Sequence, residues 1–370
     1  MGLHPDVKKH LRERFPACAN DDVPAVAADV IVWDAMWSLF KFHSDDDTKC
    51  GEDLIEFLWW PLERFFLAGG NTYVVCFDIP EHVPNAKSEE HAKRYGSTPP
   101  EPLTSTECSF RKLPAPWRSA LANRRVRAEV CAFIAAGFEQ RFEKKKSTFP
   151  RSTAHIIVHG TGDAIKKISF SGCREMPEHA GACKIGEGDL SVAYWAHHFH
   201  ASNVVVRVLD SDQIPILMIR AHLTEWNDPD APSGELYVWL VNPKNNPEVQ
   251  TGNYPYMPRE QHTLIDILAL NAAVQKRGTD IAEYVLWIIA QKTDFTLKVI
   301  QNLGVAQSML ELEKARTGAV RVTASHAHCD GLRVSASFKR AATDSKRGNA
   351  GVIKSHETEL RRSWWTLLYW

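Results

Sequence analysis

The stretch TYVVCFD, residues 72–78, decides the fold, because a run of strand-forming residues ends there in an aspartate. It follows EDLIEFLWWPLERFFLAGG (52–70), whose apolar spacing and closing glycines predict a helix with a defined C-terminal end. Before that helix lies DVIVWD (29–34), a second apolar run that ends in aspartate. Two such runs joined by a helix form a βαβ unit, so we predict that these two strands are parallel.

The same alternation continues outward along the chain. HIIVHG (155–160) and VVVRVLD (204–210) are further strand candidates, and IPILMI and ELYVWLV (235–241) follow Asp212. Helical patterns come last, at 259–275, 279–291 and 296–314. We therefore predict an α/β fold with a central, mostly parallel, twisted sheet and helices on both faces.

Residues 95–150 interrupt the alternation. A loop rich in Pro, Ser and Thr comes first, and a long helical pattern dense in Arg and Lys follows over 116–146. This part of the chain is interpreted as an insertion above the sheet.

Composition bounds the class of protein. The 370 residues carry 44 Lys and Arg against 45 Asp and Glu, so bulk charge gives no sign of a polyanion partner and any basic surface must be local. The eight cysteines lack C-x-x-C spacing, which favours reduced thiols in an intracellular protein. The N-terminus has no apolar signal core and no run nears the length of a bilayer span, so no membrane association is expected.

Acidic residues follow the predicted strands. Asp34, Asp78 and Asp210 end three of them, and the carboxyl ends of parallel strands meet at one edge, where open α/β sheets bind their ligands. Asp212 lies two residues beyond Asp210, and Asp294 follows a later apolar run and could reach the same edge.

GEGDLSVAYWAH (186–197) adds two more acids, Glu187 and Asp189, at the predicted start of a helix. Glycines bracket them, on a stretch that lets the backbone bend closely, and an apolar stripe follows at Leu190, Ala193 and Tyr194. One acid satisfies the positive end of a helix dipole. The second acid is therefore interpreted as a metal ligand.

Seven carboxylates in one cleft would repel one another unless divalent cations lay between them. Oxygen-rich sites suit hard cations, so we expect Mg²⁺ here, which Mn²⁺ could replace. The predicted metal ligands are Asp34, Asp78, Glu187, Asp189, Asp210, Asp212 and Asp294.

Each feature also has a simpler interpretation. A single strand-end aspartate usually caps a helix or forms a turn. The basic residues Arg124, Arg125 and Arg127 could bind a nucleic-acid strand or form a solvated helix face. The run HHFH (197–200) suggests zinc, yet histidines one and two residues apart on a helix cannot all face one ion.

Six stretches occur in the order, and with the acids, of the PIN-like 5′ nuclease superfamily, which includes flap endonucleases, XPG-type nucleases and Xrn-type 5′ to 3′ exoribonucleases. They are MGLHPDVKKHLRERFP, VIVWDAMWSLF, VVCFDIPEHVPNAKSEEHAKRY, GEGDLSVAYWAH, VLDSDQIPILMI and IIAQKTDFTLKVIQNLG. The chain resembles this superfamily in these scattered blocks, and they span its first 310 residues or so.

The resemblance implies roles for particular residues. All seven acids match the family's metal ligands, and Lys87 and Arg94 match its basic pair beside the scissile phosphate. Gly2 resembles the family's N-terminus near the active centre, and the insertion at 95–150 resembles the helical arch that admits a single strand. His91 stands where a more polar or basic contact to nucleic acid is expected.

The implied activity is hydrolysis of phosphodiester bonds by a two-metal mechanism. The expected enzyme is a structure-specific flap endonuclease or 5′ to 3′ exonuclease acting on DNA with a free 5′ end or flap, in replication and repair. Two alternatives stay open: a 5′ to 3′ exoribonuclease or RNA endonuclease, and an inactive nuclease-fold scaffold that binds nucleic acid. The chain departs from flap endonucleases after Asp294, where only Gly304 remains of the glycine-rich motif that grips duplex DNA.

The resemblance and the composition of the C-terminal residues together suggest three regions. Residues 1–220 form a nuclease core that includes the arch, 221–315 complete the core with a helical duplex-binding-like region, and 316–370 form a basic tail with an aromatic end that packs back. We expect a monomer inside the cell, in the nucleus in preference to the cytoplasm, and we identify no sliding-clamp partner.

Overall fold

The computed structural model describes residues 11–20, 28–42, 50–78, 113, 117–122, 124–161, 164–185, 188–209, 211–224, 226, 234–242, 261–282 and 284–285. Contacts group the chain into two compact units. Residues 21–209 and 233–263 form the larger unit, and residues 1–20, 210–232 and 264–370 form the other. Each unit combines segments far apart in the sequence, and the predicted region limits at 220 and 315 stay predictions.

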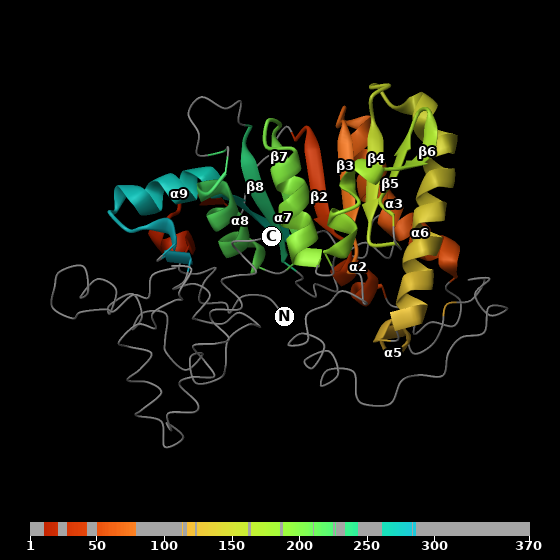
Figure 1. The fold of residues 1–370 in the computed structure, drawn as a ribbon, viewed down its shortest axis with the longest axis horizontal. Helices are drawn as coiled ribbons and strands as arrows, with labels where there is room; N and C mark the ends of the chain where they lie inside the picture. Colours follow the sequence, from red (N-terminus) through yellow and green to blue (C-terminus); the bar gives the residue numbers. More distant parts are fainter. Residues whose placement is uncertain are drawn as a thin grey trace, which may run out of the picture. The chain divides into compact units, whose positions relative to one another are not determined.

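The larger unit is an α/β structure with a mostly parallel mixed sheet (Figure 1). Its strands lie in the order β8-β7-β2-β3-β4-β5-β6. All pairs from β8 to β4 are parallel, and the pairs that β5 makes are antiparallel. The strand bounds are β2 Val30–Asp34, β3 Thr72–Cys76, β4 His155–His159, β5 Lys166–Ser169, β6 Gly172–Glu175, β7 Val204–Val208 and β8 Leu236–Asn242.

Strands β2, β3, β4, β7 and β8 match predicted apolar runs within two residues at each end, so the predicted α/β class and parallel βαβ unit are confirmed. The run IPILMI, given above with the strand candidates, instead forms part of a helix, α8 (Gln213–His222). The hairpin of β5 and β6 was not predicted. Its strands have four residues each, and its turn depends on Gly172, whose φ of 104° favours glycine.

Helix α3 (Gly51–Leu67) connects β2 to β3, as the spacing of residues 52–70 predicts. It begins at Cys50, whose backbone N–H donates to the Asp53 carboxylate over 2.8 Å. It ends before Gly69, which takes the left-handed φ of 89° that stops helices.

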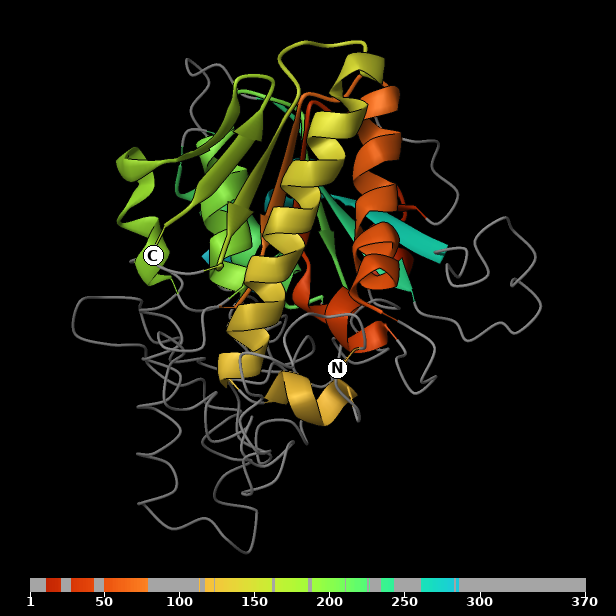
Figure 2. The ribbon, with the colours of Figure 1, turned by 90° about the vertical axis from the view of Figure 1, so that its right-hand side faces the viewer.

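Helices cover both faces of this sheet, as predicted. Figure 2 shows α3 and α6 (Arg124–Lys145) side by side on one face, and α7 (Gly188–His198) lies on the other. Short helices α2 (Met36–Lys41) and α5 (Trp117–Ala122) lie near the carboxyl ends of the strands, where the Trp117 indole donates to the Leu39 carbonyl over 2.6 Å.

Strand alternation divides the side chains between the two faces. Ile31 and Trp33 of β2 point into a large core shared with α3 and α6, which also contains Phe66, Phe138 and Phe142. The alternate residues of β2, including Val30 and Val32, are buried on the α7 face.

The expectation of an inserted arch over all of 95–150 is too broad. From Val126 onward α6 buries Val130, Ile134, Phe138 and Phe142, so this helix is a layer of the core. Burial of each large apolar side chain stabilises the fold by roughly 1.5–3 kcal/mol. The helix therefore packs in the core, although its many Arg and Lys residues suggested an arch. All of 95–112 lies outside the described residues.

The described residues of the other unit include helices α8 (Gln213–His222) and α9 (Ile267–Lys276). Strand β1 (Ala19–Asn20) pairs antiparallel with the end of β9 (Gln261–Asp266), and Ala19 lies opposite Ile265. The helical prediction for 259–275 is therefore wrong in its first half. Asp266 explains the boundary, since its carboxylate accepts from the Ala269 N–H over 2.8 Å and starts α9.

None of the helices in the described ranges is long and apolar enough to cross a membrane.

Candidate active site at the carboxyl ends of β2 and β3

Asp34 ends β2 on the face that carries α7. Its neighbour Trp33 points into the opposite core, and alternation turns Asp34 the other way. Asp34 lies opposite Cys76 of β3, and its Oδ1 accepts from the Met36 N–H over 3.1 Å, which starts helix α2. The strand register and this turn together fix the carboxylate at the sheet edge.

Asp78 lies two residues beyond the end of β3, and it meets the start of α7. The Gly188 N–H donates to Asp78 Oδ1 over 2.7 Å. A Cβ at position 188 would lie 2.7 Å from Asp78 Oδ1 and 3.5 Å from Asp34 Oδ1. Both carboxylates therefore approach the same glycine, and no larger residue fits there without moving Asp78.

Asp189 is the next residue in this first turn of α7, and its side chain is half-buried. The structure thus brings Asp34, Asp78 and the helix start that carries Asp189 to one place.

The Cys76 thiol lies close enough to both strand-end carboxylates for their charges to affect its pKa. Complete burial raises the pKa of this thiol well above its ordinary value, and the charges of Asp34 and Asp78 raise it further. The thiol therefore stays neutral and adds no negative charge beneath the two acids. Sequence reasoning did not single out Cys76.

Arg127 of α6 brings positive charge to the same region. Only 3% of its surface is exposed, and it lies beside Cys131, one helical turn along α6. Burial raises the pKa of Cys131 to about 12, an effect that Arg127 opposes and Asp78 reinforces. Arg127 and Asp78 therefore act on the same buried thiol from two different elements.

Arg125 has a different environment from Arg127, although both were predicted to bind nucleic acid. Its side chain is exposed and pairs with Glu129 over 3.1 Å, one turn along the helix. A strand lying over the surface of α6 would meet Arg125 and would not meet Arg127. Arg124 belongs to the same helix, but its side chain lies outside the described ones.

His159 supports α7 from the end of β4. It is fully buried, and the Trp195 indole N–H donates to its Nδ1 over 3.0 Å. Burial lowers the pKa of His159 to about 4, despite the opposing effect of the Ala182 carbonyl. A neutral imidazole therefore holds α7 against the sheet at neutral pH.

The buried face of α7 differs from the predicted stripe. Val192 and Trp195 are completely buried, and Leu190 and Tyr194 are half-buried. Ala193 is buried as predicted, but the completely buried Val192 and Trp195 lie outside the predicted stripe. Its sequence signal was weak because serine and alanine occupy part of the buried face at Ser191 and Ala196.

Asp212 lies in the other compact unit. It occupies the N-cap position of α8 and is 5% exposed. Its side chain makes no cap hydrogen bond to the first turn of this helix.

Several predicted site residues lie outside the described part of the chain. Three are proposed metal ligands and four are proposed nucleic-acid contacts: Glu187, Asp210, Asp294, Gly2, Lys87, His91 and Arg94. Within the described residues, no group of three or more His, Cys, Asp or Glu side chains is arranged to hold a metal ion. Of the proposed metal ligands, Asp34, Asp78, Asp189 and Asp212 have described positions.

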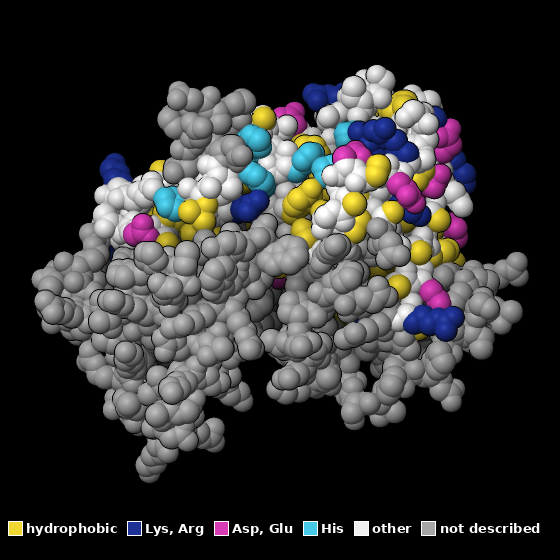
Figure 3. Space-filling model, in the orientation of Figure 1, with side chains coloured by type: hydrophobic (Ala, Val, Ile, Leu, Met, Phe, Trp, Pro, Cys, Tyr) yellow, Lys and Arg dark blue, Asp and Glu magenta, His cyan; other side chains and the backbone are white. Residues whose placement is uncertain are grey.

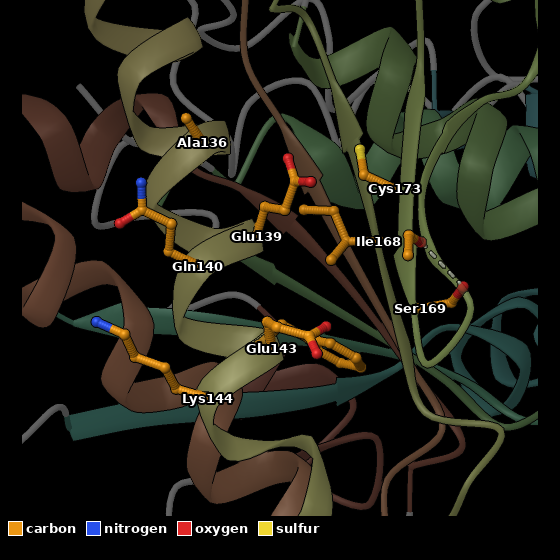
Figure 4. Close-up of a pocket in the computed structure, with 10 residues that line it drawn as sticks. Ala136, Glu139, Gln140, Glu143, Lys144, Ile168, Ser169 and Cys173 are labelled. Atoms are coloured by element: carbon orange, nitrogen blue, oxygen red, sulfur yellow. Dashed lines mark hydrogen bonds between the residues drawn. The ribbon is translucent and has the colours of Figure 1, made fainter.

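A groove of about 600 Å³ lies between α6 and the β5–β6 hairpin (Figure 4). The Glu139 carboxylate points toward Cys173 across Ile168, while Gln140 and Lys144 point away. Burial raises the pKa of the Cys173 thiol, and the charge of Glu139 raises it further. None of the predicted site residues lines this groove.

In comparison with known proteins, the chain matches no protein-family model and no curated protein sequence.

Proposed function

We propose that the protein is a divalent-metal-dependent 5′ nuclease that hydrolyses phosphodiester bonds, with DNA as the favoured substrate. The observation that carries the proposal is the meeting of Asp34, Asp78 and Gly188 at the carboxyl ends of two adjacent parallel strands. Ligands of open α/β sheets bind at this edge. The family resemblance of the surrounding sequence adds the reaction class.

The chemistry of the donors fits hard cations. Carboxylate oxygens are the ligands that Mg²⁺ and Mn²⁺ prefer, and the nearby Cys76 thiol stays neutral and is not a competing soft ligand. Two carboxylates beside one glycine repel each other, and a cation between them would remove that cost. Asp189, on the first turn of α7, would complete the described part of the donor set.

When bound, two divalent cations would supply an activated water and stabilise the leaving oxygen. The chain's own residues would position the reaction. The Met36 N–H holds the Asp34 carboxylate, and the Gly188 N–H holds that of Asp78, so neither must reorganise during turnover. Lys87 and Arg94 are proposed to stabilise charge on the phosphate, and Arg127, which acts on the same buried Cys131 thiol as Asp78, is proposed to add positive charge to this region.

A purely structural role for these acids is the main alternative, because Asp34 starts a helix and Asp78 accepts from one. The two roles make different predictions for metal dependence. Caps act through hydrogen bonds alone, which asparagine also makes, whereas metal ligands need the charge.

The test is a cleavage assay with 5′-labelled substrates in one buffer, with Mg²⁺ or with EDTA. The panel contains 5′-flap DNA, nicked DNA, single-stranded DNA and 5′-monophosphorylated RNA. We expect Mg²⁺-dependent cleavage of DNA with a free 5′ end or flap. Cleavage of RNA alone would favour the exoribonuclease alternative, and no cleavage of any substrate would favour the scaffold.

Asp29 provides a matched control. It precedes β2 at the opposite end of the strand, where its carboxylate lies 3.9 Å from Arg151. Asp29→Asn should cleave at the wild-type rate, and Asp34→Asn should not. Equal rates for the two variants would contradict the proposed role of Asp34.

A further inference from the structure

Two basic side chains face each other across the β5–β6 hairpin. Lys167 of β5 lies directly opposite Arg174 of β6 in the antiparallel register. Opposed residues of an antiparallel pair have Cβ atoms about 4.5–5.5 Å apart, and like charges at such positions destabilise the pair. These two residues, the hairpin cations, therefore repel each other unless an anion lies beside them.

The hairpin cations also lack acidic partners. Neither forms an ion pair with a carboxylate among the residues that the structure describes. Basic residues of α6 differ in this respect, because they pair with acids of α3: Arg141 lies 2.7 Å from Glu56, and Lys145 lies 3.0 Å from Glu63. The positive charge of α6 is thus balanced where the two helices meet, and that of the hairpin is not.

The charges of the pair affect the groups around it. Burial lowers the pKa of Lys167, the charge of Arg174 lowers it further, and the charge of Glu178 opposes both effects. Burial also lowers the pKa of His155, and both hairpin cations lower it further despite an opposing backbone hydrogen bond. Two cations beside one exposed acid leave net positive charge on this part of the surface.

The hairpin cations lie on the same face of the sheet as Asp34. Ile168 points into the core beneath α6, so strand alternation turns Lys167 and Arg174 toward the face that carries α7. Figure 3 shows Lys and Arg side chains gathered on this face over β4 and β5. Helix α7 packs against β2, β3 and β7, and Arg174 is exposed to one side of it.

The sheet register gives the distance from the hairpin cations to the proposed nuclease site. Asp34 is level with His159, and Lys167 lies opposite Ile157, two residues earlier on β4. Strands are about 4.8 Å apart and residues about 3.3 Å apart along a strand, so three strands and two residues correspond to roughly 16 Å. One strand of a duplex carries a phosphate every 3.4 Å or so of helix axis, and about five nucleotides cover this distance.

We propose that Lys167 and Arg174 bind the phosphate backbone of the nucleic acid, so that the strand held at Asp34 continues across the β5–β6 hairpin. The inference rests on the proposed nuclease function, which places the scissile phosphate near Asp34. Charge complementarity carries it, because a polyanion removes the repulsion between two unpaired cations. Arginine can also donate two parallel hydrogen bonds to one phosphate. Contacts of this kind position a nucleic acid without reading its bases.

The test is fluorescence anisotropy of labelled single-stranded and 5′-flap DNA, measured in EDTA over a series of salt concentrations so that binding occurs without cleavage. Each phosphate contact to a single strand contributes about 0.7 to the slope of log affinity against log salt. Lys167→Gln/Arg174→Gln should therefore lower the slope by about 1.4 and weaken binding at least about tenfold at about 0.1 M salt. Glu178→Gln removes the opposing charge and should tighten binding.

Arg141→Gln/Lys145→Gln is the matched control, because it removes one Arg and one Lys from α6, where both are paired with acids. It should bind DNA within about twofold of wild type, since salt screens charges far from the bound strand. Wild-type binding in the hairpin variant, or equal losses in the two double variants, would overturn the proposal. Unchanged DNA binding with lost binding of poly-glutamate would assign the surface to an acidic protein, and would also overturn it.

Cleavage of the same DNA in Mg²⁺ separates this inference from the proposed function. If the wild type binds DNA with the expected salt effects but cleaves none of the substrates, the nuclease proposal fails and the phosphate-binding surface stands. If the wild type cleaves DNA and the hairpin variant binds it unchanged, the surface fails and the nuclease proposal stands.

Discussion

The two faces of the central sheet differ in chemistry. The face toward α3 and α6 buries a continuous apolar core that includes Trp33, Tyr73 and Phe142. The face toward α7 places Asp34, Asp78 and His159 at the carboxyl ends of its strands. The face toward α3 and α6 therefore holds the large apolar core, and the face toward α7 holds the strand-end acids of the candidate site, whereas Arg127 comes from α6. Changes on the first face should alter folding, and changes on the second should alter chemistry.

The largest expected effect is on the α7 face. Asp78→Asn keeps an oxygen that can accept from the Gly188 N–H but removes the charge. We expect nuclease turnover to fall by at least about 10²-fold, as for loss of a transition-state contact, while the thermal midpoint changes by only a few degrees. Asp78→Ala removes both the charge and the acceptor oxygen, so it should lower both turnover and the thermal midpoint. Turnover within a factor of two of wild type for Asp78→Asn would show that Asp78 has only a structural role.

On the opposite face, Phe142→Ala should lower the free energy of unfolding by about 3–5 kcal/mol, because it empties a fully buried site among Phe66, Phe149 and Phe170. Urea denaturation measures this change. Leu67→Ala is the control. Half of Leu67 is exposed, so it should stay within about 0.5 kcal/mol of wild type. Equal effects of the two substitutions would contradict the assignment of the core to this face.

His159 predicts a pH dependence of stability. Its pKa is lowered to about 4 in the fold, so the folded protein favours the neutral ring. The contribution of the neutral His159 ring to the free energy of unfolding is complete above the ordinary pKa of histidine, about 6.5. It is lost as the pH falls from there toward 4. It amounts to roughly 3 kcal/mol at most.

His159→Asn keeps an acceptor for the Trp195 N–H and cannot titrate in this range. The unfolding free energy of wild type should therefore fall more steeply than that of the variant between pH 6.5 and 4. Parallel curves would show that His159 does not titrate as described.

The smallest effect comes from a single methyl group. Gly188→Ala places a Cβ 2.7 Å from Asp78 Oδ1, so the carboxylate must move. We expect about a tenfold loss of turnover with little change in stability, since alanine is a better helix former than glycine. Gly181→Ala meets no atom within 4 Å and should leave turnover unchanged. Wild-type turnover in Gly188→Ala would contradict the proposal that the start of α7 positions the Asp78 carboxylate.

Sequence patterns predicted the parallel strands because each one is a short apolar run with a clear polar end, such as Val30–Asp34. They also placed Asp34 and Asp78 at one sheet edge, since parallel strands share that edge. The burial of α6 was not predicted, because its many Arg and Lys residues made its apolar pattern hard to recognise in the sequence. The apolar face is evident only from its packing against α3.

Other features depend on contacts between residues that are distant in the sequence. The motif HHFH and the segment around His179 each lack metal-ligand spacing, yet the fold brings His179 to His198. Similarly, Thr72 and His155 are 83 positions apart in the sequence, yet Thr72 Oγ1 lies 3.3 Å from His155 Nε2. The spacing of residues in the sequence can identify metal ligands within one helix or strand. It cannot identify pairs of residues that only tertiary packing brings together.

The central claim is that negative side chains meet around divalent cations at the carboxyl ends of β2 and β3. Titration of the protein with Mn²⁺, followed by electron paramagnetic resonance, tests this directly and independently of any substrate. We predict two bound ions with a spin-coupled spectrum in the wild type and in Asp29→Asn, and loss of the coupled signal in Asp34→Asn and Asp78→Asn. The same Mn²⁺ stoichiometry and spectrum in all four proteins would contradict the account.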